Sequence, residues 1–142
     1  FSNWRGLFLD TSTRTVSEKQ LQWLTKELQH TNEPIAIFMH HPPIISGVPF
    51  MDKNHALDNM SEFQRVLTKY DHTIPIFSGH YHVEKTVCKG NIALQITPSC
   101  YCQIAQNSIS FKVDHYRIAY RKIEFLKDRW TSTVKYMRGN RL

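Results

Sequence analysis

The chain has 142 residues, of which 41% are hydrophobic and 12% aromatic, and its formal net charge is +6. This composition predicts one globular domain, residues 1–142, with a buried core. No apolar run approaches the roughly 20 residues that span a bilayer, so we expect no membrane partner. The first residues, FSNWRGLFLD, contain no targeting signal. Because the chain begins with Phe, close to a strand-like stretch, we expect it to be a piece of a longer protein.

The excess of positive charge lies toward the C-terminus. Residues 1–111 contain nine Lys or Arg and nine Asp or Glu, whereas residues 112–142, from Lys112 through Arg141, contain nine and three. These basic residues alternate with apolar ones, as in HYRIAYRKIEF, and this pattern favours the solvated face of a strand. A basic surface that binds polyanions through Arg117, Arg121 and Arg129 is the alternative.

The three cysteines are Cys88, Cys100 and Cys102. An odd number argues against a disulfide-stapled secreted domain and favours a reducing compartment, which predicts a cytoplasmic protein. We expect these thiols to be buried as small apolar side chains. The alternative is that Cys100 and Cys102 act as a pair of thiolate ligands.

The first helix and two strands follow from the apolar pattern. A strand ends near Asp10, and the segment SEKQLQWLTKELQH, residues 17–30, predicts a helix. Ser17 and Gln20 form a predicted capping box at its start. The helix presents one apolar stripe, and residues 35–39, IAIFM, form a short apolar run that fits a strand covered on both faces. The stripe consists of Leu21, Leu24 and Leu28.

The order of the next elements predicts a parallel sheet. A loop over residues 40–55 leads to a second helix over residues 56–70, and TIPIFSG then forms a buried strand that ends at Ser78. Strands that alternate with helices indicate an α/β fold. From residue 84 the apolar period becomes two, with a tight turn at Gly90 and Asn91, so we expect antiparallel strands there. The inward residues of the second helix are Leu57, Met60, Phe63 and Leu67.

Four histidines follow two of these strands. His40 and His41 come after IAIFM, and His80 and His82 come after IPIFSG. The carboxyl ends of neighbouring parallel strands meet at one edge of a sheet, so we expect the four imidazoles to lie together. A single histidine there would more often be a satisfied polar residue, but the shared placement favours a metal site.

The local sequence also suits a rigid site. His80 and His82 are two residues apart, and in an extended segment such side chains point to the same side. Gly79 would allow a sharp turn away from the strand. Pro42 and Pro43 would stiffen the exit of the other strand.

The motifs HHPP and GHYH, together with FLDT, EKQLQWL, GVPFMD and GNIALQITPS, resemble those of the calcineurin-like metallophosphoesterases. The likeness is to the class III cyclic nucleotide phosphodiesterases and the related glycerophosphodiesterases. It covers residues 5–100, whereas residues 103–142 match little and are expected to form extra strands. The resemblance implies that the chain forms the C-terminal half of a four-layer αββα sandwich.

The same resemblance implies a centre with two divalent metal ions, for which Mn, Fe or Zn are suitable. By motif position, His40 and His80 would bind one metal and His82 the other. His40 is preferred to His41 because the family's ligand stands two residues before a proline. His41 would lie behind the ligands or face the substrate, as a candidate catalytic residue.

The chain departs from the family by lacking its Asp-x-His, Gly-Asp and Gly-Asn-His-Asp/Glu motifs. Asp10 has no histidine nearby, and FLDT resembles a later strand of the family, so the missing motifs are expected upstream of Phe1. Without a bridging carboxylate, three imidazoles would hold at most one ion well. For this chain alone, the sequence therefore predicts an incomplete metal site.

The function implied is phosphodiester hydrolysis by a hydroxide that two metals activate, and small phosphodiesters, including cyclic nucleotides, would be the substrates. A non-catalytic remnant of the fold and a basic polyanion-binding module are the alternatives, and nucleic acid is the less favoured partner. Asp52 either shapes the substrate pocket or belongs to a loop that leads into the second helix. The same two alternatives apply to its neighbours Phe50, Met51, Asn54 and His55. An exposed sheet edge would favour a homodimer.

Overall fold

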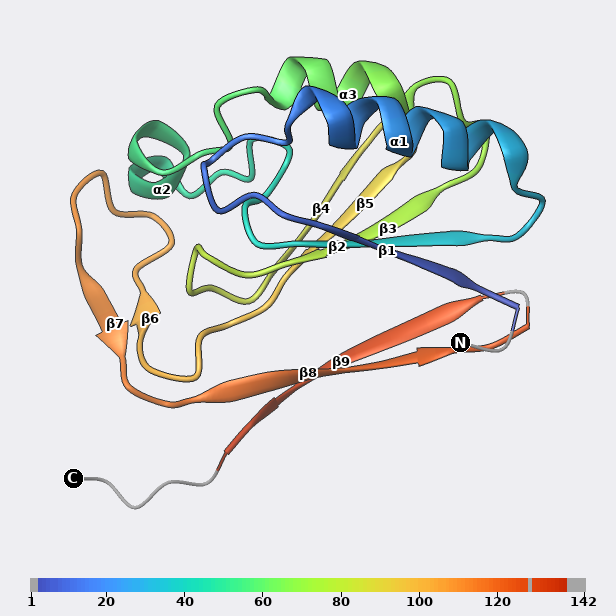
Figure 1. Cartoon of the computed structure of the whole chain (residues 1–142). Helices are drawn as coiled ribbons and strands as arrows, with labels where there is room; N and C mark the ends of the chain where they lie inside the picture. The colour runs from blue at the N-terminus through green and yellow to red at the C-terminus, as the bar shows by residue number, and fades with distance from the viewer. Residues whose placement is uncertain (1–2, 128, 138–142) are drawn as a thin grey trace.

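The computed structural model describes residues 3–127 and 129–137. Its centre is a five-stranded sheet in the order β1-β2-β3-β5-β4, with helices on one face and a hairpin across the other (Figure 1). No helix of the described part is long and apolar enough to cross a membrane. The strands of the sheet are β1 (Arg5–Leu9), β2 (Ile35–Met39), β3 (Ile74–Ser78), β4 (Lys85–Lys89) and β5 (Ile92–Ile96).

The parallel arrangement predicted from the sequence is confirmed. β1, β2, β3 and β5 pair in parallel, and β4 pairs with β5 antiparallel across the predicted turn. Gly90 in that turn has a φ of 56°, a conformation that glycine adopts without a Cβ clash. β5 was expected in a separate antiparallel part, but it extends the parallel sheet, with Ile92 opposite Ile74 of β3. The architecture is therefore a mixed α/β fold with a parallel sheet.

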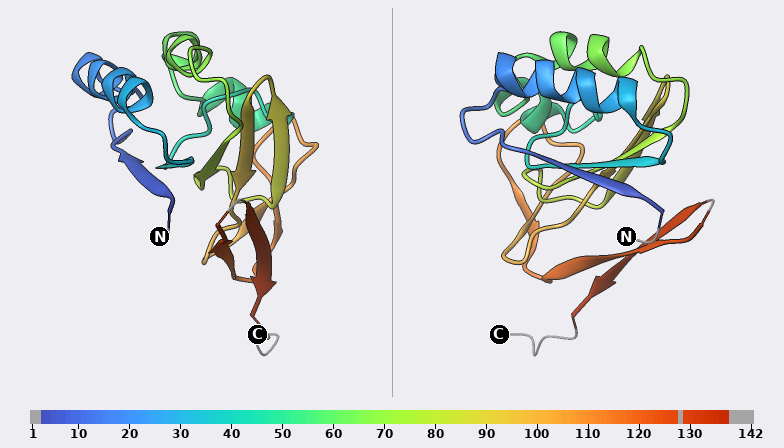
Figure 2. Two further views of the ribbon diagram at one scale, coloured as in Figure 1. Left: turned by 90° about the vertical axis from the view of Figure 1, so that its right-hand side faces the viewer. Right: turned by 45° about the vertical axis from the view of Figure 1, so that its right-hand side comes forward.

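The helices α1 (Glu18–His30), α2 (Pro49–Asn54) and α3 (Met60–Leu67) lie on one side of the sheet (Figure 2). α2 lies within the segment predicted as a loop, and α3 is shorter than the predicted helix over residues 56–70. Asn59 explains the late start of α3, because its side chain exchanges two hydrogen bonds with the backbone of Val16, at 3.0 and 2.8 Å. The residues that these helices and their approaches bury in the core include Leu24, Leu28, Met51, Leu57, Phe63 and Leu67.

The start of α1 departs in part from the predicted capping box. The Ser17 hydroxyl accepts a hydrogen bond from the backbone N–H of Gln20 at 3.3 Å, as expected. The Gln20 side chain, however, pairs with the backbone of Asp10 through two hydrogen bonds of 2.8 Å. It therefore fixes the beginning of α1 to the end of β1.

The remaining strands form two antiparallel pairs, β6 with β7 and β8 with β9. The β8–β9 hairpin covers part of the sheet face opposite the helices, where Phe125 and Trp130 meet Phe77 and Trp4. Phe8 on β1 stays 65% exposed and stacks on Phe38. These layers fit a fragment of a metallophosphoesterase sandwich. The bounds are β6 Gln103–Ile104, β7 Val113–His115, β8 Ala119–Phe125 and β9 Trp130–Tyr136.

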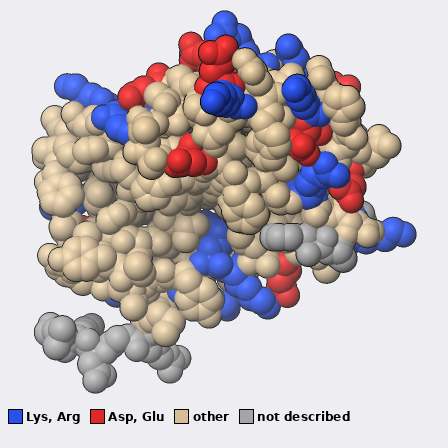
Figure 3. Space-filling model, viewed as in Figure 1, with Lys and Arg blue, Asp and Glu red and all other residues tan. Residues whose placement is uncertain are grey.

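The basic residues of the hairpin divide between its two faces. Lys122 and Lys135 are exposed, as expected for a solvated strand face. Arg121 instead lies half-buried on the inner face, where it donates a hydrogen bond of 2.9 Å to the carbonyl of Ile96, so it does not belong to an open basic surface. On the face shown in Figure 3, Lys and Arg are interspersed with Asp and Glu over the helices. Arg138 and Arg141 lie outside the described residues.

The burial expected of the cysteines holds for one of the three. Cys102 is buried, whereas Cys88 and Cys100 are exposed. Cys88 lies on β4, the last strand of the sheet, and Cys100 lies in the connection between β5 and β6. Neither position is covered by a neighbouring strand or helix.

Candidate metal centre

The loops that follow β2 and β3 bring His40 and His80 together at one edge of the sheet. The backbone N–H of Gly79 donates to the carbonyl of His40 at 3.1 Å, which joins the two loops. The Nε2 atom of His40 lies 3.0 Å from the Nδ1 atom of His80. The meeting of these two histidines, which the strand order predicted, is therefore present.

His41 lies behind this pair. Its side chain is buried, and its ring centroid lies 4.2 Å from that of His80. Its Nδ1 atom is 2.9 Å from the hydroxyl of Thr11, which also accepts the backbone N–H of His41 at 3.3 Å. Thr11 entered the sequence-based prediction only within the motif FLDT, although its place two residues after β1, at the same edge of the sheet, was a usable signal. A catalytic role of His41 stays a prediction.

The backbone around His80 and His82 differs from the extended segment that we expected. His80 has a φ of 63° and His82 a φ of 51°, so both are left-handed. Gly79, to which the turn was assigned, lies outside the left-handed region. Between the two histidines, Tyr81 is fully buried, and its N–H donates to the carbonyl of Gly79 at 2.7 Å. The tight turn that buries Tyr81 thus falls on the histidines themselves.

His82 lies beside the segment that follows β5. Its Nδ1 atom is 3.7 Å from the sulfur of Cys102, and its backbone carbonyl accepts the N–H of Ile104 at 3.0 Å. His55 is a further neighbour of the cluster, with its ring centroid 5.9 Å from that of His80. With Thr11 included, the histidines and their neighbours therefore come from five connections of the fold and not only from the two that the motifs indicated.

The surroundings of His40, His41 and His80 favour the uncharged form of these three rings. Burial, followed by the neighbouring His41 and His40, lowers the pKa of His80 to about 4. Partial burial lowers the pKa of His40, and burial also lowers that of His41. At neutral pH the three rings are therefore neutral, which is the form that binds metals. The Nε2 atom of His80 is buried and has no hydrogen-bond partner among the described residues.

This donor set fits part of a metal centre. Neutral imidazoles are suitable ligands for Mn, Fe or Zn. The Nε2 atom of His80, which has no hydrogen-bond partner among the described residues, is available as such a ligand. Within residues 3–127 and 129–137, however, no group of three or more His, Cys, Asp or Glu side chains is arranged to hold a metal ion. The assignment of His40, His80 and His82 as metal ligands therefore stays a prediction, and the chain shows imidazole donors without a closed coordination shell.

Asp52 lies in α2, and its side chain has a structural role in the loop that precedes this helix. Its carboxylate accepts hydrogen bonds from the backbone N–H groups of Ser46, Gly47 and Val48, at 2.8 to 3.3 Å, and from the Ser46 hydroxyl at 3.1 Å. This arrangement favours the structural interpretation of the segment, although Asp52 stands in α2 itself and not in a loop that leads into a helix. Asp52 also lies near the buried Tyr81, where burial and this carboxylate raise the pKa of the tyrosine.

Asp52→Ala is expected to lower the free energy of unfolding by about 2 kcal/mol, because several backbone donors lose a charged acceptor. Urea unfolding followed by circular dichroism measures this change. Asp58→Ala is the matched control, since its ion pair with Arg14 is exposed and contributes less than about 1 kcal/mol. Equal stabilities of the two variants would contradict the structural role of Asp52.

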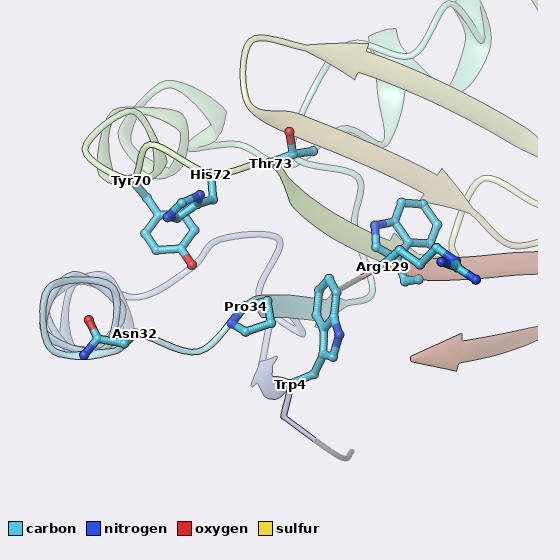
Figure 4. Close-up of a pocket in the computed structure, with 8 residues that line it drawn as sticks. Trp4, Asn32, Pro34, Tyr70, His72, Thr73 and Arg129 are labelled. Carbon is cyan, nitrogen blue, oxygen red and sulfur yellow. The ribbon is translucent and has the colours of Figure 1, made fainter. Parts of the chain in front are cut away.

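A pocket of about 410 Å³ lies at the opposite end of the parallel strands (Figure 4). Trp4, Pro34 and Thr73 directly precede β1, β2 and β3, so this pocket is separated from the histidines by the length of the sheet. His72 is the one histidine in its lining. The lining residues are Trp4, Asn32, Pro34, Tyr70, His72, Thr73, Arg129 and Trp130.

Comparison with known proteins finds relatives that are described as phosphodiesterases. No family model matches it. It is 36% identical over 118 residues to a probable cyclic nucleotide phosphodiesterase of Fibrobacter succinogenes, covering 83% of this chain and 46% of the relative. It is 30% identical over 131 residues to the 3′,5′-cyclic adenosine monophosphate phosphodiesterase CpdA of Escherichia coli K12, covering 88% and 47%.

The fold has a counterpart among solved structures. A dimetal phosphatase from Danio rerio superposes with a TM-score of 0.52 at 22% identity, over 76% of this chain and 34% of that one. The chain thus spans about half the length of the curated relatives it matches, and this coverage fits the C-terminal part that its motifs predict. From its sequence matches, its sheet and its histidine motifs, the chain belongs to the calcineurin-like metallophosphoesterases.

Proposed function

We propose that this chain supplies the histidine side of a binuclear metal centre that hydrolyses small phosphodiesters, with cyclic nucleotides as the substrate class. The observation that carries the proposal is the approach of His40 Nε2 to within 3.0 Å of His80 Nδ1 at the carboxyl ends of β2 and β3. The relatives that are described as cyclic nucleotide phosphodiesterases support the substrate class.

In this proposal His40 and His80 bind one divalent ion and His82 contributes to the second. When bound, such ions neutralise phosphoryl oxygens and lower the pKa of water. His41, held by Thr11 at 2.9 Å, fixes the position of the His80 ring. The low pKa of His80 keeps its ring uncharged, so that protons do not compete with the ion near neutral pH.

The remaining ligands have to come from outside this set of histidines. Carboxylates are the expected complement, because a bridging carboxylate lowers the repulsion between two cations. A second copy of the chain is one source, since β1 is a strand at the edge of the sheet and can pair with another strand. Gel filtration with light scattering then measures whether metal binding and dimer formation occur together.

A titration with Mn²⁺ tests the site, because this paramagnetic ion broadens the NMR signals of nearby nuclei even when it binds weakly. We expect the ring signals of His40, His80 and His82 to broaden first. The ring of His72, at the other end of β3, serves as the internal control. Equal broadening of the His72 ring and of these three rings would reject the proposed centre.

A second measurement separates an enzyme from a non-catalytic remnant of the fold. The chain is incubated with 3′,5′-cyclic AMP and Mn²⁺, and release of the phosphomonoester is followed by chromatography. Turnover that disappears with a chelator supports the phosphodiesterase. Selective broadening of the His40, His80 and His82 signals without turnover supports a metal-binding module whose catalytic ligands are absent from this chain.

A further inference from the structure

Cys102 contacts His82, and the proposed metal centre does not explain this contact. Its sulfur lies 3.7 Å from His82 Nδ1, within hydrogen-bond distance for sulfur. Cys102 is 5% exposed, so water competes little for this contact. Two residues further on, the N–H of Ile104 donates to the carbonyl of His82 at 3.0 Å. The segment 102–104 therefore holds both the ring and the backbone of His82.

The backbone of His82 leaves its ring few other ways to be fixed. His82 is in the left-handed conformation, and its neighbours Tyr81 and Val83 are both buried. These anchors set the Cα–Cβ direction, and only the side-chain torsions stay adjustable. A partner for one ring nitrogen then determines the orientation of the ring.

A neutral imidazole carries one N–H, and the partner also determines which nitrogen holds it. If the Cys102 thiol donated to Nδ1, the proton would remain on Nε2 and would block that nitrogen for a cation. If Nδ1–H donates to the sulfur, the Nε2 lone pair is free. Only the second tautomer is compatible with a divalent ion at Nε2.

We infer that Cys102 is a positioning residue for His82, and that its sulfur accepts the Nδ1–H hydrogen bond and leaves Nε2 free to bind a divalent cation. The part that concerns the cation rests on the proposed function. The orientation and the tautomer of the ring do not, because they are properties of the chain without metal. The thiol itself is not a ligand in this arrangement.

NMR of the metal-free chain tests the tautomer. Long-range ¹H–¹⁵N spectra at about pH 8, above the ordinary pKa of histidine, distinguish protonated from unprotonated ring nitrogens. We expect the Nδ1–H form to dominate for His82 and to give way to the Nε2–H form in Cys102→Ala. Cys102→Ser, which keeps an acceptor, is expected to retain part of the Nδ1–H form. The same tautomer in wild type and Cys102→Ala would overturn the inference.

Zinc affinity, measured by calorimetry, gives the second readout. Cys102→Ala is expected to bind Zn²⁺ about 10-fold to 100-fold more weakly than wild type, as is typical for the loss of a partner that orients a metal-binding histidine. Cys102→Ser should recover part of the loss. Cys100→Ala, which removes an exposed thiol two residues away, should change nothing. Equal affinities of wild type and Cys102→Ala would reject the positioning role.

These outcomes separate the two proposals. If wild type binds no Zn²⁺ but the His82 tautomer depends on Cys102, the metal centre is wrong and the orientation of His82 by Cys102 stands. If Co²⁺ produces a thiolate charge-transfer absorption that Cys102→Ala removes, the sulfur binds the ion itself, and the inference is overturned. Unfolding in urea confirms that each variant is folded before it is titrated.

Discussion

His80→Ala is expected to lower the affinity of the chain for Zn²⁺ by more than about 100-fold, the upper range for loss of an outer partner of a metal-binding histidine. Among the histidines of the proposed centre, two observations favour His80 as a metal ligand. Its Nδ1 atom lies 3.0 Å from His40 Nε2, and its Nε2 atom is buried without a partner among the described residues. Calorimetric titration of the two proteins with Zn²⁺ measures the change.

The control for this variant is His72→Ala. His72 precedes β3, whereas His80 follows it, so the two substitutions remove the same side chain from opposite ends of one strand. The affinity of His72→Ala should equal that of wild type. His80→Asn adds a check on folding, because asparagine tolerates the left-handed backbone at this position. Unchanged Zn²⁺ affinity in both His80 variants would remove His80 from the site.

Arg121→Ala is expected to lower the free energy of unfolding by about 3 kcal/mol, because it removes a half-buried cation that makes several charged hydrogen bonds. The guanidinium of Arg121 joins the hairpin to the end of β5 and its continuation. It donates to the side chains of Gln95, Thr97 and Ser132 and to the carbonyl of Ile96, at 2.6 to 3.3 Å. Burial lowers the pKa of Arg121, yet the group stays charged at neutral pH.

Urea unfolding gives the change in stability, and native-state hydrogen exchange shows where it arises. The amides of β8 and β9 should lose protection in Arg121→Ala, while those of β3 keep theirs up to global unfolding. Lys122→Ala is the control, since Lys122 is exposed and its partner is Glu124 on the same strand. We expect the free energy of unfolding of Lys122→Ala to differ from that of wild type by less than about 1 kcal/mol. A matching small effect of Arg121→Ala would show that the hydrogen bonds of Arg121 contribute little to holding the hairpin on the sheet.

The strands and α1 were predictable because their apolar periodicity is a local property of the sequence. The helix limits were not, because Asn59 stops the second helix from starting early by bonding to Val16, a residue far away in the chain. The same reason hid the true position of β5. Its pattern indicated a strand, but only the pairing of Ile92 with Ile74 places it in the parallel sheet.

The candidate site was predictable as a place and not as a geometry. Strand ends collect at one edge by topology, so His40 and His80 could be brought together from the sequence. The contacts of Thr11 with His41 and of Cys102 with His82 join residues that no spacing rule connects. The left-handed turn was also missed, because the burial of Tyr81 forces it and this burial depends on the whole fold.

In the proposed metal centre, the left-handed backbone at residues 80 and 82 also limits which ligands can replace the two histidines. Asparagine and aspartate accept this conformation more readily than other residues with a side chain. A carboxylate or amide oxygen can therefore enter either position without moving the turn, whereas cysteine would add strain. Oxygen donors prefer hard cations such as Mn²⁺ or Mg²⁺ to Zn²⁺. The turn thus restricts substitution at these positions to changes that shift metal preference toward harder ions.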